Sequence, residues 1–214
     1  MLSQDRDLLI LEPNLFRDVQ PAGQTLFTGV CDVDEFSAII TESSAPLAAT
    51  GVAPGCVALI DGVAYEIMEI SGIDALAISR LRADPAQLTP LMPRQKAALP
   101  IVIVSFAPQL FAVYHQVLRM AGIEPSGAPL PSTPTQSQIT NAAALIPLIS
   151  LGALALIYHG AGAGLPADSP ENQRALLYQR RFETESERTT LSLDLNHDAI
   201  PDAIRTLRGG AMTR

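Results

Sequence analysis

The stretch GCVALIDGVAYEIMEISGIDALAISRLR (residues 55–82) decides the fold class. Its Asp-Gly pair at 61–62 separates two apolar runs, and this dipeptide favours the positive φ angles of a two-residue hairpin turn. The turn and the apolar runs predict strands over residues 56–60, 63–70 and 75–81. Upstream, residues 25–31 and 36–42 have the composition of two further strands. Short strands joined by tight turns predict a small antiparallel β-barrel or sandwich.

The second half of the chain has helical patterns. Residues 107–122 combine an early proline, an apolar stripe at helical spacing and a final glycine, which is typical of a capped amphipathic helix. Residues 142–158 and 169–191 are expected to pair as an antiparallel helical hairpin, whose second arm begins with Ser169 as N-cap and Pro170 as first helical residue. The predicted fold class is therefore α+β, a β domain plus a helical part containing this hairpin.

The expected organisation follows the chain from end to end. It consists of a leading segment (1–24), a β domain (25–84), a linker (85–100), a strand and helix (101–123), a loop (124–138), the helical hairpin (139–191), and an Asp-rich turn with a basic C-terminal arm (192–214).

The hairpin's first arm has an alternative interpretation. Residues 142–158 contain no charge and reach the lower edge of a membrane span. Pro147 and Gly152, the abundance of alanine, and flanks without positive charge or Trp favour a buried helix instead. A membrane-associated protein anchored through 142–158, with a soluble β module, stays as the second hypothesis.

Charge is unevenly distributed along the 214 residues, whose net charge is −8. Residues 1–74 hold twelve acidic residues and two arginines, a net charge of −10, whereas residues 75–214 hold ten acidic and twelve basic residues, a net charge of +2. This composition argues against a protein that wraps nucleic acid, because phosphate neutralisation requires clustered Lys and Arg. It favours contacts between copies or with charged partners. The two cysteines, Cys31 and Cys56, lack redox or zinc spacing and are expected as small buried side chains.

The Asp-rich segment SLDLNHDAIPDAIR (192–205) is the one candidate metal site. Asp194, Asn196, Asp198 and Asp202 begin like a calcium loop, but Ala199 and an arginine stand where an EF-hand requires Gly and Glu. We expect side-chain turns that lead into a helix beginning at Pro201, and no bound metal.

Other catalytic patterns are absent from the sequence. The three histidines are scattered, no Gly-x-Ser-x-Gly motif occurs, and the Gly-rich segment 159–166 follows a helix rather than a strand. Glu66 and Glu69 are expected on opposite faces of one strand. Neither an enzymatic activity nor a cofactor is expected, and a metal-dependent enzyme would have to rely on the Asp-rich turn.

Three segments together resemble the neck proteins of tailed bacteriophages and prophages, of the head–tail connector or adaptor type. They are the meander at 51–84, the helix opened by Phe-Ala-Pro-Gln and closed by Gly-Ile within 105–125, and the pattern LGALALIY, NQRALLYQRRFETESER and LDLNHDAIPDAIRTLRGG. Connector-like proteins often follow such a hairpin with an Asp-x-Asp-Gly-Asp-Gly turn. Here His197 and Ala199 replace both glycines, which weakens metal binding while keeping a strand-to-helix joint.

The resemblance implies a structural virion protein without enzymatic activity. Such proteins are made in the host cytoplasm and form a ring of about a dozen copies in the neck of the virion. The implied partners are the portal protein, adjacent neck or tail proteins and further copies of the chain, while genome DNA passes through without sequence-specific binding, and no membrane is involved. Candidate docking residues in the basic C-terminal arm are Arg205, Arg208 and Arg214.

Overall fold

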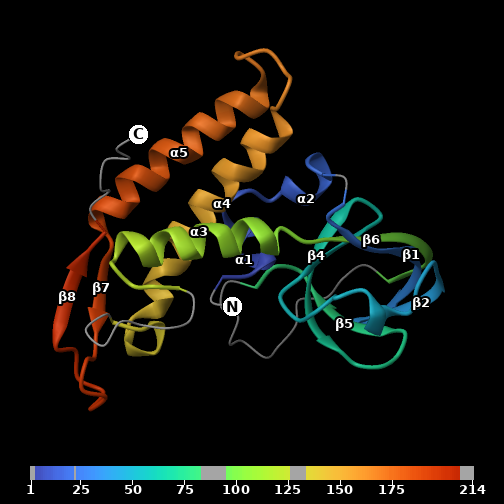
Figure 1. Cartoon of the computed structure of the whole chain (residues 1–214). Coiled ribbons are helices and arrows are strands. Elements are labelled where there is room, and N and C mark those ends of the chain that lie inside the picture. The colour runs from blue at the N-terminus through green and yellow to red at the C-terminus, as the bar shows by residue number, and fades with distance from the viewer. Residues whose placement is uncertain (1–2, 22, 83–94, 126–133, 208–214) are drawn as a thin grey trace. The chain divides into compact units, whose positions relative to one another are not determined.

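In the computed structural model, which describes residues 3–21, 23–82, 95–125 and 134–207, the chain divides into two units (Figure 1). The barrel unit comprises Gln4–Phe106, and the helical unit comprises Ala107–Arg214 together with Met1–Ser3. The fold is mixed α+β, as predicted from the sequence.

The strands of the barrel unit form a closed antiparallel barrel. Their order around the barrel is β1-β2-β5-β4-β3-β6, and each strand is antiparallel to both neighbours. The strands are β1 (Thr25–Asp34), β2 (Ser37–Ser43), β3 (Val57–Ile60), β4 (Val63–Ile70), β5 (Ala75–Ser79) and β6 (Lys96–Val104). The Asp61-Gly62 turn between β3 and β4 has the expected positive φ angles of 50° and 77°.

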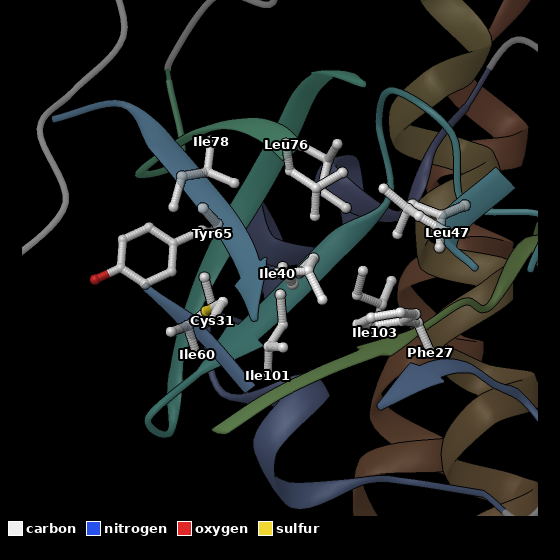
Figure 2. Close-up of a cluster of buried hydrophobic side chains, with 14 of the residues drawn as sticks. Phe27, Cys31, Ile40, Leu47, Ile60, Tyr65, Leu76, Ile78, Ile101 and Ile103 are labelled. Carbon is white, nitrogen blue, oxygen red and sulfur yellow. The ribbon is translucent and has the colours of Figure 1, made fainter. Parts of the chain in front are cut away.

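Alternate residues of these strands fill the barrel interior (Figure 2). Phe27, Ile60, Ile67, Ile101 and Ile103 are at most 3% exposed. The side chains come from β1, β3, β4 and β6, so the core depends on all sides of the barrel at once. The two cysteines are free and buried, as expected, and burial raises the pKa of each thiol to about 11.

Two segments have more structure than the sequence analysis expected. Within the segment interpreted as a linker (85–100), β6 begins at Lys96 and lies between β1 and β3, so it closes the barrel. The leading segment forms α1 (Asp5–Leu11) and α2 (Leu15–Asp18). Both pack within the barrel unit: the Arg6 N–H donates to the Gly55 carbonyl at 3.1 Å, and the rings of Phe16 and Phe106 lie 5.1 Å apart.

The helical unit contains three long helices and a β-hairpin (Figure 1). The predicted helical hairpin is confirmed as α4 (Ile146–Ala161) and α5 (Pro170–Arg188), and α3 (Ala107–Met120) packs on α4. The Ser169 side chain caps α5 by accepting from the Asn172 N–H, and Gly122, with φ 69°, follows the end of α3 as expected. The chain then forms β7 (Thr190–Leu193) and β8 (Ala203–Thr206), which are antiparallel. The described residues also include three short 3-10 helices, Leu47–Ala49 in the barrel unit and Gln136–Gln138 and Ala142–Leu145 in the helical unit.

Gly152 allows the three long helices to approach closely. A Cβ atom at this position would lie 2.6 Å from Val113 Cγ1 on α3 and 3.0 Å from the ring of Phe182 on α5. Nine of the sixteen residues of α4 are buried, as in the central helix of a packed unit. Among the described residues, Ala142–Ala161 is also the one helical segment whose length and mean hydropathy (1.9) would suit a bilayer, a property that core helices share.

Candidate functional site

The Asp-rich turn connects β7 to β8. The expectation of a helix beginning at Pro201 was wrong, because Ala203–Thr206 pairs with Thr190–Leu193 as a strand. The segment 194–202 is therefore the loop of a β-hairpin and not a strand-to-helix joint.

Backbone N–H groups donate hydrogen bonds to the carboxylates of this turn. Asp194 accepts from the N–H groups of Asp198 at 3.2 Å and Ala199 at 2.8 Å. Asp202 Oδ2 accepts from the N–H groups of Leu195 at 2.8 Å and Asn196 at 3.2 Å. The Asn196 amide in turn donates to Asp198 Oδ2 at 3.1 Å and to Asp202 Oδ1 at 3.3 Å. These hydrogen bonds use the oxygens of the candidate ligands to hold the loop itself. Asn196 and Asp198 also make the side-chain turns expected from the sequence, since they accept from the N–H groups of Asp198 at 3.0 Å and Ile200 at 2.8 Å.

The electrostatics of Asp194 agree with a structural role. Burial alone would raise the pKa of its carboxyl, but hydrogen bonds from the N–H groups of Ala199, His197 and Asp198 hold that pKa below its ordinary value. Within the part of the chain that the structure describes, no three His, Cys, Asp or Glu side chains converge as a set of metal ligands.

The two positions that hold glycine in the connector-type turn have a left-handed backbone here. His197 has φ 62° and Ala199 has φ 67°, a region that residues with a Cβ rarely adopt. The loop therefore has, at two non-glycine residues, a backbone conformation that glycine adopts most readily.

Arg205, the first of the three docking candidates, contacts its own unit. Its Nη1 donates to the Ala121 carbonyl at 2.6 Å, just beyond the end of α3. A cation there compensates the negative end of the helix dipole. Arg208 and Arg214 lie outside the described residues.

The Gly-rich segment after α4 is fixed by one side chain. The Asn172 amide donates to the Pro166 carbonyl at 2.8 Å and to the carbonyls of Gly162 and Leu165, each at 3.4 Å. Backbone carbonyls directed at an amide form a helix connection, and they are not the N–H cradle that binds phosphate.

A buried cluster of charges was missed by the sequence analysis. Glu66 on β4 is 1% exposed and lies between two guanidinium groups. It accepts from Arg6 Nε at 2.5 Å, from the Arg82 N–H at 3.1 Å and from Arg82 Nε. Arg6 also donates to the Arg82 carbonyl at 2.7 Å. The cluster joins α1 to the central strand β4 and to the segment that follows β5. Each buried charge thereby has a partner of opposite sign.

The expectation that Glu66 and Glu69 lie on opposite faces of one strand was also wrong. A β-bulge between Ile67 and Glu69 shifts the register, so that Glu69 pairs with Ala77 and Ile70 packs against the core. Both glutamates therefore lie on the outer face of the barrel, where Glu69 is exposed and Glu66 is bound by its arginines.

Comparison of the chain with protein-family models, with curated proteins and with solved structures finds no significant match.

Proposed function

We propose that this chain is a structural virion protein of a tailed phage or prophage, forming a ring in the neck that joins the portal to the tail and lines the DNA channel. The segments that carry the resemblance correspond to β3–β4–β5, to α3 with its Gly122 end, and to the α4–α5 hairpin with the Asp-rich turn. This order of elements supports the proposal. The proposed function of the chain is mechanical and non-enzymatic.

The observation that carries the proposal is that the two clusters of polar side chains in the described structure bind the chain's own groups. The side chains of the Asp-rich turn and of the Glu66 cluster bind their own chain, so their chemistry serves folding. Charged side chains of α5 and of the barrel remain exposed on the described surface. Exposed charges can steer and orient a macromolecular partner, and this supports a function through contact.

The charge distribution also suits a channel. Residues 4–106 hold thirteen acidic and six basic residues, a net charge of −7, and residues 107–214 hold nine acidic and eight basic residues, a net charge of −1. Phosphates bind where Lys and Arg cluster, so an acidic wall lets DNA slide without binding it.

Light scattering of the purified chain with added portal rings tests this function. We expect a large complex of fixed stoichiometry that contains about a dozen copies of the chain per portal. Absence of binding to the portal would contradict the proposal.

The membrane alternative is supported by the composition of α4 and uses the same preparation. A chain anchored through 142–158 would require detergent and would float with lipid vesicles in a density gradient. A connector would remain at the bottom of the gradient without detergent, because α4 is covered by α3 and α5.

A further inference from the structure

The outer stripe of α5 forms a basic groove next to α4. The groove is a hollow of about 340 Å³ whose lining includes Leu151 and Leu177 as apolar surface and Arg180, Arg181 and Arg188 as charges. Leu177, Arg180, Arg181 and Arg188 recur at helical spacing, so they share one face of α5. Leu177 is 45% exposed, so the groove presents apolar surface to solvent beside its three cations.

The arginines of the groove are available for an external partner. Among the described residues, none of the three is in a salt bridge, and Arg181 lies over the Tyr178 ring at 5.8 Å. Glu185 is the only carboxylate in the lining. The groove therefore has an excess of positive charge and an apolar floor, which suits an acidic partner with some apolar surface.

The barrel has an outer face of this kind, over β1, β2, β5 and β4. The strand register places Asp32 beside Ile39 and Ala75, and Asp34 in one row with Ser37, Ala77 and Glu69. The sequence neighbours of these residues on the same strands, such as Ala38 and Leu76, point into the core. Because side chains alternate along a strand, the side chains of the two rows point outward. Ile73 and Asp74 follow at the β4–β5 connection, and Ile39 and Ile73 are 47% and 78% exposed. We call Asp32, Asp34, Ile39, Glu69, Ile73 and Asp74 the acidic face.

Among the described residues of the barrel unit, no basic side chain is paired with the acidic face. Within the described barrel unit, Arg6 and Arg82 are buried with Glu66, Arg17 pairs with Asp18, and Lys96 pairs with Asp61. Arg80, which is exposed, follows β5 at the end of that strand farther from Asp74.

We infer that the basic groove of one copy docks on the acidic face of a second copy. The sizes agree: eleven helical steps from Leu177 to Arg188 span about 17 Å, and four adjacent strands span about 14 Å. Because the two surfaces differ, the contact is heterologous, and its repetition produces a ring or a filament. This inference rests on the proposed function and specifies which surfaces join the copies.

Charge-swapped variants test the contact in the full-length chain. Variant A carries Glu69→Arg and Asp74→Arg, and variant B carries Arg180→Glu and Arg188→Glu; all four side chains are exposed. Sedimentation velocity at rising concentration should show assembly of the wild type that weakens at high salt, since salt screens exposed charges. Each variant alone should associate at least tenfold more weakly. An equimolar mixture should regain assembly, because each A–B contact then joins opposite charges.

Controls separate this contact from a general effect of charge. Arg119→Glu on α3 and Asp168→Arg before α5 each reverse one exposed charge outside both surfaces and should assemble like the wild type. Circular dichroism establishes that A and B are folded. A wild type that stays monomeric at all concentrations, variants that assemble normally, or a mixture that does not regain assembly would each overturn the inference.

The portal experiment gives an independent result for the function. Assembly regained by the mixture, without binding to portal rings, would uphold this interface and refute the neck function. Portal binding by A and B at the wild-type level would uphold the function and refute the interface.

Discussion

Replacement of Glu66 by Gln should strongly destabilise the barrel unit. The carboxylate is 1% exposed and is the shared acceptor of Arg6 and Arg82, which are 3% and 6% exposed. Glutamine keeps the shape of the side chain but removes the negative charge, and its amide group presents donors to guanidinium donors. Two buried cations would then lose their common counter-ion.

Removing one partner from a buried ionic cluster costs about 3–5 kcal/mol. The slowest backbone amides of β3, β4 and β5 exchange through unfolding of the barrel, so their hydrogen exchange measures its stability directly. Since 1.4 kcal/mol corresponds to a factor of ten, Glu66→Gln should accelerate that exchange by roughly two to four orders of magnitude.

Glu69→Gln is the matched control, on the same strand and the same outer face but exposed. It should change the stability by no more than about 0.5 kcal/mol. If Glu66→Gln costs less than about 1 kcal/mol, the cluster does not hold α1 to the barrel and the reasoning fails. Replacing Arg6, Glu66 and Arg82 together by apolar residues should cost much less than Glu66→Gln, because no uncompensated charge stays buried.

Three further predictions concern other parts of the chain. Burial raises the pKa of the Asp5 carboxyl from 3.8 to about 6. The wild type should therefore lose up to about 3 kcal/mol of stability as the pH rises from about 4 to above 6, because the unfolded chain ionises first. Urea unfolding at a series of pH values should show this loss in the wild type and not in Asp5→Asn. Gly152→Ala should lower the thermal midpoint of unfolding, because overpacking against Val113 costs about 1–3 kcal/mol. The control Gly160→Ala lies on the same helix, and its added Cβ meets no atom within 4 Å. It should raise the midpoint, because alanine gains about 1 kcal/mol in helix propensity over glycine. Ala199→Gly should slow amide exchange in β7 and β8, since relief of a left-handed alanine is worth about 1 kcal/mol; unchanged exchange would contradict the strain.

The local elements of the fold could be predicted from the sequence where short-range chemistry determines them. Asp61-Gly62 fixes a tight turn, and Ser169 and Pro170 mark the start of α5 because capping needs only neighbouring atoms. The helical hairpin followed from the apolar composition of 142–158 and the caps around it.

Features that depend on long-range partners could not be predicted in this way. The strand expected from residue 101 covers only the second part of β6. Its first part, residues 96–100, ends in Pro100 and follows a proline-rich segment, so only pairing with β1 and β3 identifies that part as a strand. The bulge after Ile67 moves Glu69 to the outer face, which strict alternation cannot anticipate. The burial of Glu66 depends on two arginines that lie sixty and sixteen residues away in sequence.

The prediction of a helix after Pro201 was wrong because it, too, ignored a partner strand outside the local sequence. Ile204 and Arg205 are compatible with a helix, but pairing with Ser192 and Leu191 satisfies their backbone groups as a strand. The side-chain turns expected at Asn196 and Asp198 are present, because they depend only on N–H groups two residues further along the same loop.

The position of β6 also determines when the barrel can form during synthesis. β6 pairs with residues of β1 that lie about seventy positions earlier, at Gly29↔Ile101. Until the ribosome has added residues as far as Val104, the nascent chain presents two unpaired edges, on β1 and on β3. Contacts this distant form slowly, and open edges pair with other chains in the meantime. The interval between the synthesis of Ile60 and that of Val104 is therefore when the barrel strands are most exposed to aggregation on the way to the native state.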